Sequence, residues 1–365
     1  MRILVYFGHP SQYLFLRESI KRLKNNGHKF EILIKTKDVL HDLLLNDGLK
    51  DFKNILFEKR GNSIFSIIFS YLKRLVKIFF IIKKFKPDLL IGTDPTIAQV
   101  GFFLGIDRIT TIEDDYEIIK PLAWMTYPFT QTIVCPKVCK VGMWGNKKIG
   151  YEGYMKLGYL HPNVFKLEKN IKEKYSLPEK FVILRLSGLN AYHDIGVDGI
   201  NRKTLDQIIN ILNIKNINIF ISSEEKLDKK HDKFRLNILP NDIHHILSLS
   251  MFLISDSQSM TVEAAVIGVP SIRFSSFSGK ISVLEELEKK YSLTYGLKTN
   301  DADNLFKHID YLLKVPNLKD VWEAKLKSML SEKIDVTSFL IWFFENYPAS
   351  NAVIKNNANF QKRFL

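Results

Sequence analysis

Short runs of β-branched and aliphatic residues alternate along this chain with amphipathic stretches of helical period, and the alternation starts afresh near the middle. The first run is RILVYF at residues 2–7, followed by an amphipathic stretch over 12–26. The same rhythm resumes with FVILRL at residues 181–186. Because strands that alternate with helices pair in parallel, each half predicts a parallel sheet with helices on both faces. At roughly 150 residues per domain, a chain of 365 residues predicts two such α/β domains.

The predicted strands are rich in Val, Ile, Leu and Phe, and they are 2–7, 29–34, 88–91, 109–112, 132–134, 181–186, 217–221, 251–254 and 271–274. The predicted helices include 12–26, 63–85, 202–212, 283–291 and the strongly apolar 335–347. We therefore expect a first domain over 1–160, a second over 161–335, a helix over 336–347 that crosses back to the first domain, and a loosely held polar tail over 348–365.

Small and polar residues follow four of these strands. They occupy 8–11, 92–96, 187–190 and 255–260. In open parallel sheets, ligands bind outside the carboxyl ends of the strands. We therefore expect the four loops to line one site, with the two sheets facing each other across a cleft.

The stretch SDSQSMTVEAA at 255–265 predicts a strand that runs directly into a helix. The first N–H groups of a helix are unpaired and carry partial positive charge, so they bind phosphate well. The residues that would present such groups are Ser257, Gln258, Ser259 and Met260. Glu263, one turn further on, can accept hydrogen bonds from ribose hydroxyls. The alternative is a capped helix whose dipole Glu263 balances.

The segment SDSQSMTVEAAVIGVPSIRF resembles the nucleotide-binding segment of the two-domain glycosyltransferase B (GT-B) superfamily. That superfamily includes the glycosyltransferase MurG and the UDP-N-acetylglucosamine 2-epimerases. More specifically, the chain resembles the predicted glycosyltransferases catalogued as domain of unknown function 354 (DUF354). The features that carry this resemblance are 256–260, the segment YEGY at 151–154, and Asp115 and Glu117 ahead of TYPF at 126–129.

The resemblance implies a GT-B fold of two Rossmann-like domains, with the nucleotide held by the second domain. The residues implied to bind the nucleotide sugar are Arg185, Ser187, Gly188, Ser257, Gln258, Ser259, Met260 and Glu263. Arg185 lies in an apolar strand, where an unpaired charge is costly. A bound anion and a structural ion pair are the two hypotheses for its partner.

The first domain would supply the acceptor side and the catalytic base, for which the candidates are His9, Asp94, Asp115 and Glu117, with Glu113 and Asp114 beside them. Four carboxylates within five residues can raise one pKa by mutual repulsion. The plain alternatives are a turn histidine, an Asp that starts a turn, and a solvated acidic loop. Related proteins have a His directly after the glutamate matched by Glu117, where this chain has Ile118. His193 is the candidate to replace it.

Positive charge is concentrated in the first half of the chain. Of the net +14, residues 1–160 contribute 25 Lys and Arg against 15 Asp and Glu, and the remainder contributes 28 against 24. Residues 63–86 combine broad apolar content with Lys73, Arg74, Lys77, Lys83, Lys84 and Lys86. This combination predicts an interfacial helix on anionic lipid. The alternative is a core helix whose lysines extend to solvent.

The compartment and cofactors are predicted from what the sequence lacks. It has neither the layout of a signal peptide nor the ~18 uncharged apolar residues of a membrane span, so we expect a cytoplasmic protein, peripheral on the inner face of the membrane. Two cysteines, Cys135 and Cys139, form neither a disulfide framework nor a zinc site. We expect no metal and no cofactor beyond a nucleotide-sugar co-substrate, UDP-linked.

These observations predict a nucleotide-sugar-dependent glycosyltransferase of surface polysaccharide or glycolipid synthesis, with a lipid-linked or glycan acceptor. The first alternative is a UDP-N-acetylhexosamine 2-epimerase, for which Asp94, Glu113, Glu117 and His193 are the implied acid and base groups. A remote alternative is a nucleic-acid-binding protein, suggested by the pI near 9.4. No zinc-finger, RNA-recognition or helix-turn-helix pattern accompanies this charge, so we expect no nucleic-acid partner.

Overall fold

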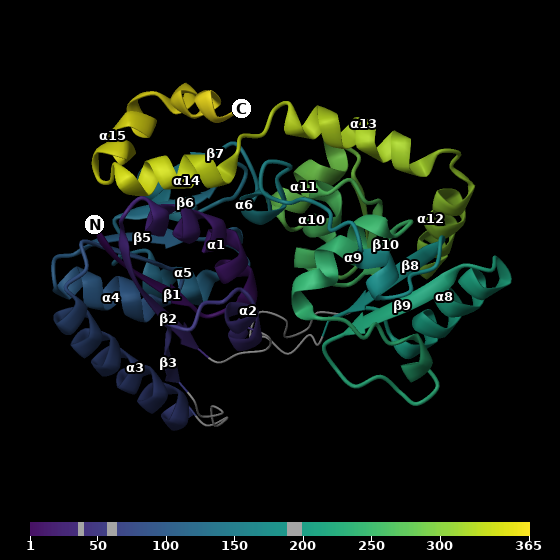
Figure 1. Cartoon of the computed structure of the whole chain (residues 1–365), viewed down its shortest axis with the longest axis horizontal. Coiled ribbons are helices and arrows are strands. Elements are labelled where there is room, and N and C mark those ends of the chain that lie inside the picture. Colours follow the sequence, from purple (N-terminus) through teal and green to yellow (C-terminus); the bar gives the residue numbers. More distant parts are fainter. Residues whose placement is uncertain (36–39, 57–63, 188–198) are drawn as a thin grey trace. The chain divides into compact units, whose positions relative to one another are not determined.

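The computed structural model describes residues 1–35, 40–56, 64–187 and 199–365 (Figure 1). These residues form two compact units. Unit 1 comprises Met1–Tyr159 together with Lys333–Leu365, and unit 2 comprises Leu160–Glu332. The short helix α6 (Leu157–Leu160) spans the break between them in the chain.

Within the described residues, unit 1 is built on a seven-stranded parallel sheet of order β3-β2-β1-β4-β5-β6-β7. Its strands are β1 (Arg2–Phe7), β2 (Lys29–Lys35), β3 (Lys53–Leu56), β4 (Leu89–Gly92), β5 (Asp107–Thr111), β6 (Thr132–Pro136) and β7 (Lys148–Tyr151). The central strands β1 and β4 are aliphatic on both faces because helices cover both sides of the sheet. Chain order reverses between β1 and β4, which makes their carboxyl ends the switch point of the sheet.

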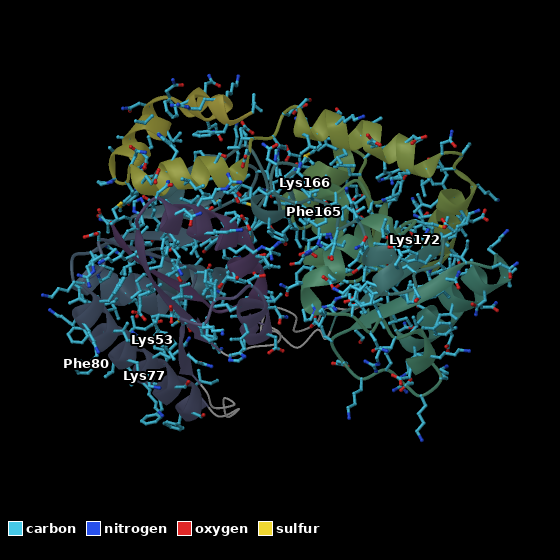
Figure 2. All side chains as sticks on the ribbon, viewed as in Figure 1. Lys53, Lys77, Phe80, Phe165, Lys166 and Lys172 are labelled. Atoms are coloured by element: carbon cyan, nitrogen blue, oxygen red, sulfur yellow. The ribbon has the colours of Figure 1, made fainter. Side chains whose placement is uncertain are left out.

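The helices of unit 1 are α1 (Pro10–Asn25), α2 (Leu40–Asn46), α3 (Ile64–Phe85), α4 (Pro95–Phe103), α5 (Lys120–Thr126), η1 (Gly142–Lys147), α14 (Val336–Glu345), α15 (Ala349–Asn356) and η5 (Ala358–Phe364). Helix α1 packs against α14, while α3, α4 and α5 pack side by side. Figure 2 labels Lys77 and Phe80 on α3.

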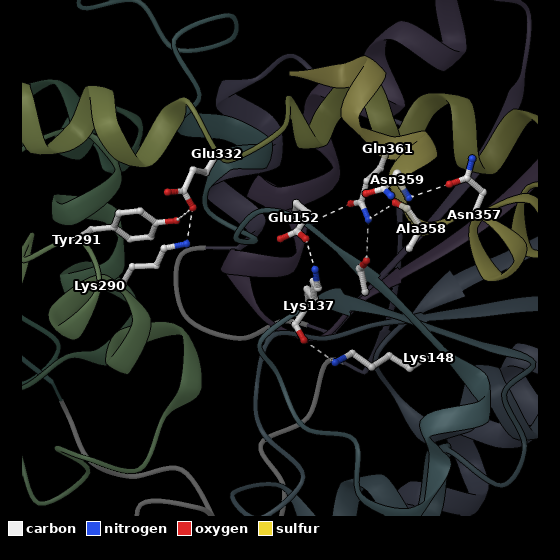
Figure 3. Close-up of polar contacts among 11 residues, drawn as sticks. Lys137, Lys148, Glu152, Lys290, Tyr291, Glu332, Asn357, Ala358, Asn359 and Gln361 are labelled. Atoms are coloured by element: carbon white, nitrogen blue, oxygen red, sulfur yellow. Dashed lines mark hydrogen bonds and ion pairs between the residues drawn. The ribbon is translucent and has the colours of Figure 1, made fainter.

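The last residues of the chain are not a loosely held tail, and that prediction is wrong. Residues 348–365 form α15 and η5 and belong to unit 1. Gln361 is 2% exposed, and its Oε1 accepts the backbone N–H of Glu152 at 2.6 Å (Figure 3). Phe360 packs on Trp342 of α14, with ring centroids 4.6 Å apart. The tail is held because it satisfies a backbone donor beside β7 and covers an aromatic ring of α14.

Within the described residues, unit 2 is built on a five-stranded parallel sheet of order β12-β11-β10-β8-β9. Its strands are β8 (Phe181–Leu186), β9 (Asn218–Ser223), β10 (Leu253–Ser255), β11 (Ser271–Phe274) and β12 (Thr294–Leu297). Its helices are α7 (Ile171–Lys174), α8 (Arg202–Ile214), η3 (Asp232–Phe234), η4 (Pro240–Asp242), α9 (Ile243–Leu249), α10 (Gln258–Val266), α11 (Ser282–Lys289), α12 (Ala302–Lys314) and α13 (Leu318–Leu330). Here the switch point lies between β8 and β10. The predicted class of two Rossmann-like α/β domains is confirmed.

Candidate functional site

Asp256 joins the two strands that meet at the switch point of unit 2. It directly follows β10 and is 3% exposed. Its Oδ1 accepts hydrogen bonds from the backbone N–H and the hydroxyl of Ser187, at 2.7 and 2.6 Å. Its Oδ2 accepts the N–H of Ile200 at 3.2 Å. Burial raises the pKa of the Asp256 carboxyl above its ordinary value.

The chain can pass Asp256 this closely only because residue 199 is a glycine. A Cβ on Gly199 would lie 2.4 Å from Asp256 Oδ2, which is far inside van der Waals contact. Asp256 therefore fixes the end of β8 and the entry to α8 relative to β10. Sequence reasoning included this residue in the nucleotide-binding segment but gave it no separate role.

A cavity of about 500 Å³ opens at this edge of the unit 2 sheet. Its described lining comes from the ends of β8, β9 and β10 and from the start of α8, and includes Ser187, Gly199, Asn201, Ser223, His231 and Asp256. Small-molecule sites have volumes of about 300–1,000 Å³, so this cavity has room for a nucleotide. His231, which sequence reasoning missed, is 4% exposed and its Nε2 lies 2.8 Å from Asp206 Oδ1.

Helix α10 begins at the carboxyl end of β10, two residues after Asp256, which lines this cavity. Ser257 is the N-cap, and its Oγ accepts the N–H of Met260 at 3.4 Å. The Met260 side chain is 5% exposed and belongs to the hydrophobic core. The N–H groups of Gln258 and Ser259, in the first turn, have no carbonyl within the helix to pair with. They are the backbone donors that a ligand at this helix start would meet.

The side chain of Gln258 is turned into unit 2. Its Oε1 accepts a hydrogen bond from Arg273 Nη1 at 2.7 Å. Its Nε2 donates to Ser275 Oγ at 3.0 Å and to the backbone oxygen of Asp256 at 3.2 Å. Gln258 therefore offers a ligand its backbone N–H, while its amide group is engaged within the protein.

Two further candidates of unit 2 have partners within the protein. Glu263 is 9% exposed, and its Oε1 lies 3.4 Å from Nε2 of His244 on α9. Arg185 donates to Ser222 Oγ at 2.9 Å and forms an ion pair with Glu224. A bound anion is therefore not needed to account for the charge on Arg185. Gly188 and His193 lie outside the described residues.

His9 and Asp94 follow the neighbouring strands β1 and β4, at the switch point of unit 1. His9 is exposed and is the N-cap of α1, and its Nδ1 accepts the N–H of Ser11 at 3.2 Å. Asp94 is the N-cap of α4, and its Oδ1 accepts the N–H of Thr96 at 2.9 Å. Its Oδ2 lies 2.6 Å from Nη1 of Arg74 on α3. Arg74, one of the basic residues of 63–86, thus pairs with Asp94 within unit 1.

The acidic loop after β5 separates into buried and exposed carboxylates. Asp115 is 3% exposed, and its Oδ1 accepts the N–H of Lys140 at 2.7 Å. Glu113 accepts the N–H of Met155 at 2.6 Å and pairs with the buried ammonium of Lys156 at 2.6 Å. Glu117 is exposed and pairs with Lys120 at 2.5 Å. Asp115 and Glu113 thus hold the loop in place, while Glu117 faces solvent.

Exposed apolar side chains cover the neighbouring helices α3, α4 and α5 of unit 1. We call this surface the apolar face, and it consists of Phe65, Ile68, Phe69, Leu72, Val76, Phe80, Phe102, Phe103, Trp124 and Met125. Exposed lysines accompany it at Lys73, Lys83, Lys84 and Lys86. An exposed patch of this kind marks an interaction surface. No helix in the described ranges is long and apolar enough to cross a membrane.

Neither thiols nor clustered metal ligands contribute chemistry to the described part of the chain. Cys135 and Cys139 are free and buried, and burial raises the pKa of both thiols, that of Cys135 to about 12. Among the residues with described positions, no three His, Cys, Asp or Glu side chains gather as a metal site.

Comparisons with known proteins relate this geometry to a family and a fold. The family model described as "Protein of unknown function (DUF354)" matches residues 4–330. A UDP-N-acetylglucosamine–N-acetylmuramyl-(pentapeptide) pyrophosphoryl-undecaprenol N-acetylglucosamine transferase of Pediococcus pentosaceus is 23% identical over 330 residues, covering 85% of this chain and 87% of the relative.

Two solved structures share the fold. UDP-GlcNAc 2-epimerase from Neisseria meningitidis bound to UDP-GlcNAc has a TM-score of 0.66 at 14% identity, covering 91% of this chain and 100% of that chain. A spinosyn rhamnosyltransferase complexed with spinosyn aglycone has a TM-score of 0.60 at 13% identity, covering 95% and 100%. This chain therefore shares the GT-B-like fold of these two proteins.

Proposed function

Because the chain belongs to the DUF354 family of proteins of unknown function, we propose its activity from its own site: it is a glycosyltransferase that uses a nucleotide-sugar donor, UDP-linked. The observation that carries the proposal is the switch point of unit 2. There Asp256 lines a cavity of about 500 Å³, and the nine-residue helix α10 begins two residues later in the chain. A helix start next to a cavity at a sheet's switch point is the arrangement that binds nucleotide phosphates in α/β proteins.

The donor is held by unit 2. The diphosphate accepts hydrogen bonds from the N–H groups of Gln258 and Ser259, and the ribose hydroxyls donate to Glu263. The positive end of α10 offsets the negative charge of the diphosphate, so the proposal includes no resident metal or cofactor. Relatives support the UDP-linked donor, since both the Pediococcus transferase and the Neisseria epimerase are named for UDP-N-acetylglucosamine.

The acceptor is activated on unit 1. Of the four candidate bases, Asp94 caps α4 and pairs with Arg74, and Asp115 is buried. His9 is exposed at the switch point of the unit 1 sheet. Histidine is also the side chain that serves most often as a general base. We therefore place His9 first as proton acceptor, with the exposed Glu117 second.

The acceptor is lipid-linked and belongs to surface polysaccharide or glycolipid synthesis. The apolar face supports this part of the proposal because large aromatic side chains and lysines occur together on it. Phe69 is 69% exposed and Phe80 is 65% exposed. Such a surface suits the boundary between acyl chains and anionic headgroups. The protein would then act as a peripheral enzyme on the cytoplasmic side of a membrane.

The 2-epimerase alternative requires carboxyl groups that exchange protons with the sugar ring. Two of its implied groups already accept hydrogen bonds at both oxygens. Asp94 accepts from Thr96 and Arg74, and Glu113 accepts from Met155 and Lys156. Carboxylates engaged in this way favour a transferase, although epimerases share the fold.

The experiment has two steps. Thermal unfolding with UDP, ADP and GDP at 100 times the dissociation constant should show about 2.7 kcal/mol of stabilisation for the true donor base, and EDTA should not remove it. Incubation with UDP-sugars alone should leave them unchanged, and a lipid-linked acceptor should start transfer. Epimerised donor or a glycal product without acceptor would establish the epimerase instead.

A further inference from the structure

Arg273 is a buried cation directly beneath the start of α10. It lies on β11, and its side chain has 0% exposure. Its Nη1 donates to Gln258 Oε1 at 2.7 Å. Within the described ranges, its Nε and Nη2 have no hydrogen-bond acceptor. A buried guanidinium with two unpaired donors is costly to fold, so packing alone does not explain an arginine at this position.

The acids around Arg273 balance its charge only in part. Glu285 on α11 lies 3.9 Å from Nη2, which is an ion pair but too long for a hydrogen bond. Glu288, on the same helix, also faces the guanidinium, and burial raises the pKa of its carboxyl. Burial lowers the pKa of Arg273 to about 10, so the guanidinium is still charged at neutral pH.

A glycine of β12 lies close to the guanidinium of Arg273. A Cβ on Gly296 would lie 2.5 Å from Glu288 Oε2 and 3.0 Å from Arg273 Nη2. Glu288 and Arg273 therefore pack directly against the backbone of β12 at Gly296. The hydrogen bond from Arg273 to Gln258 connects this cluster to the start of α10.

Gln258 connects Arg273 to the start of α10. One end of its amide is held by Arg273, and the other donates to Ser275 and to the Asp256 backbone. Gln258 is also the first residue of α10. Its backbone N–H and that of Ser259 are the donors assigned above to the diphosphate. The orientation of these donors thus depends on Arg273.

We propose that Arg273 is a positioning residue for the donor diphosphate: it holds Gln258 so that the first N–H groups of α10 face the phosphates, and its charge adds to the positive end of that helix. This inference rests on the proposed function, because it takes α10 as the diphosphate site. Arg273 itself is fully buried and touches no ligand. Its effect should therefore depend on the charge of the ligand, which a purely structural role would not.

The test compares ligands of increasing charge on matched variants. Affinities for uridine, UMP and UDP are measured by calorimetry and ligand-observed NMR on the full chain, for the parent and for Arg273→Met combined with Glu288→Gln. This pair removes one charge of each sign at similar volume. The net charge is unchanged, but the group that contacts Gln258 is the guanidinium. We therefore expect UDP affinity to fall about tenfold, UMP affinity to fall less, and uridine affinity to stay within about twofold. Arg235→Met, at the C-cap of η3, should leave all three affinities unchanged.

Gln258→Leu gives the same test if the double variant does not fold, since it keeps the guanidinium and breaks only the hydrogen bond. It should weaken UDP binding more than uridine binding. Equal loss for uridine and UDP, or no loss for UDP, in whichever variant folds would overturn the positioning role. Failure of the parent itself to bind UDP or any other nucleoside diphosphate would instead refute the proposed function, and the role of Arg273 with it.

Discussion

Replacing Asp256 by Asn should loosen the switch point of unit 2 while keeping the side-chain volume. The carboxylate accepts two hydrogen bonds from Ser187 at Oδ1 and one from Ile200 at Oδ2. An Asn side chain retains one oxygen, so its NH₂ group would face a donor, most simply the Ile200 N–H. A buried donor left without a partner costs about 1–3 kcal/mol. Relief from burying a charge offsets part of this loss, so we expect unit 2 to be destabilised by about 2 kcal/mol.

Scanning calorimetry measures this effect as a shift in melting temperature. For domains of 150–250 residues, each 1 kcal/mol lowers Tm by about 2–4 °C, so about 2 kcal/mol corresponds to a Tm about 4–8 °C lower. The matched control is Asp232→Asn, which removes a surface pair with Arg235 and should cost less than about 0.5 kcal/mol. UDP affinity should fall with Asp256→Asn as well, because Ile200, which loses its acceptor, lines the cavity. A Tm equal to that of the control variant would refute the reasoning that these three bonds hold the edge together.

Four further predictions address the pH dependence, the ribose, the base and the membrane. Burial raises the pKa of Asp256 above 3.8, so the stability that protonated Asp256 contributes is complete below pH 3.8 and is lost as the pH rises through the raised pKa. The difference in free energy of unfolding between the parent and Asp256→Asn, measured in urea, should therefore narrow with rising pH. A difference that stays constant with pH would contradict this. Glu263→Ala should weaken UDP binding by about 1.5–3 kcal/mol in calorimetry, and unchanged affinity would remove the ribose role. His9→Gln should lower turnover by about 10²–10⁴ with UDP binding intact, whereas full activity would transfer the role of base to Glu117. The parent should sediment with anionic but not neutral vesicles and be released by high salt. Replacing the exposed lysines beside the apolar face by Gln should abolish this sedimentation, whereas the same number of Lys→Gln changes on unit 2 should not. Equal binding to neutral vesicles would contradict the proposed membrane surface. The two sets are Lys73, Lys83, Lys84 and Lys86, and Lys203, Lys215, Lys229 and Lys233.

Sequence analysis found the interior strands of both described sheets and one edge strand, β9. β1 and β8 are recognisable because both faces are covered and nearly every residue is apolar. The strands it missed are β3 (KNIL), β7 (KIGY) and β12 (TYGL), and each is the last strand at one edge of its sheet. Edge strands are short and partly polar because one side has no neighbour. Their composition therefore resembles that of loops.

The candidate site could be predicted only to the level of its loops. The carboxyl ends of strands follow from the strands themselves, which is why His9, Asp94, Ser187 and Ser257 were found. Side-chain partners depend on packing directions that no local pattern encodes. The ion pair of Arg74 with Asp94, the hydrogen bond from Arg273 to Gln258, and the inward turn of Gln258 are therefore visible only in three dimensions.

Unit 1 is assembled from both ends of the chain, whereas unit 2 is one continuous segment between them. During synthesis, domains fold as units when their residues have left the ribosome. Unit 2 can therefore fold before translation is complete. Unit 1 must wait for α14, which packs on α1, and for Gln361, which accepts the N–H of Glu152. In a chain truncated before residue 333, all of unit 2 would be present, whereas unit 1 would lack α14 and still expose part of its core.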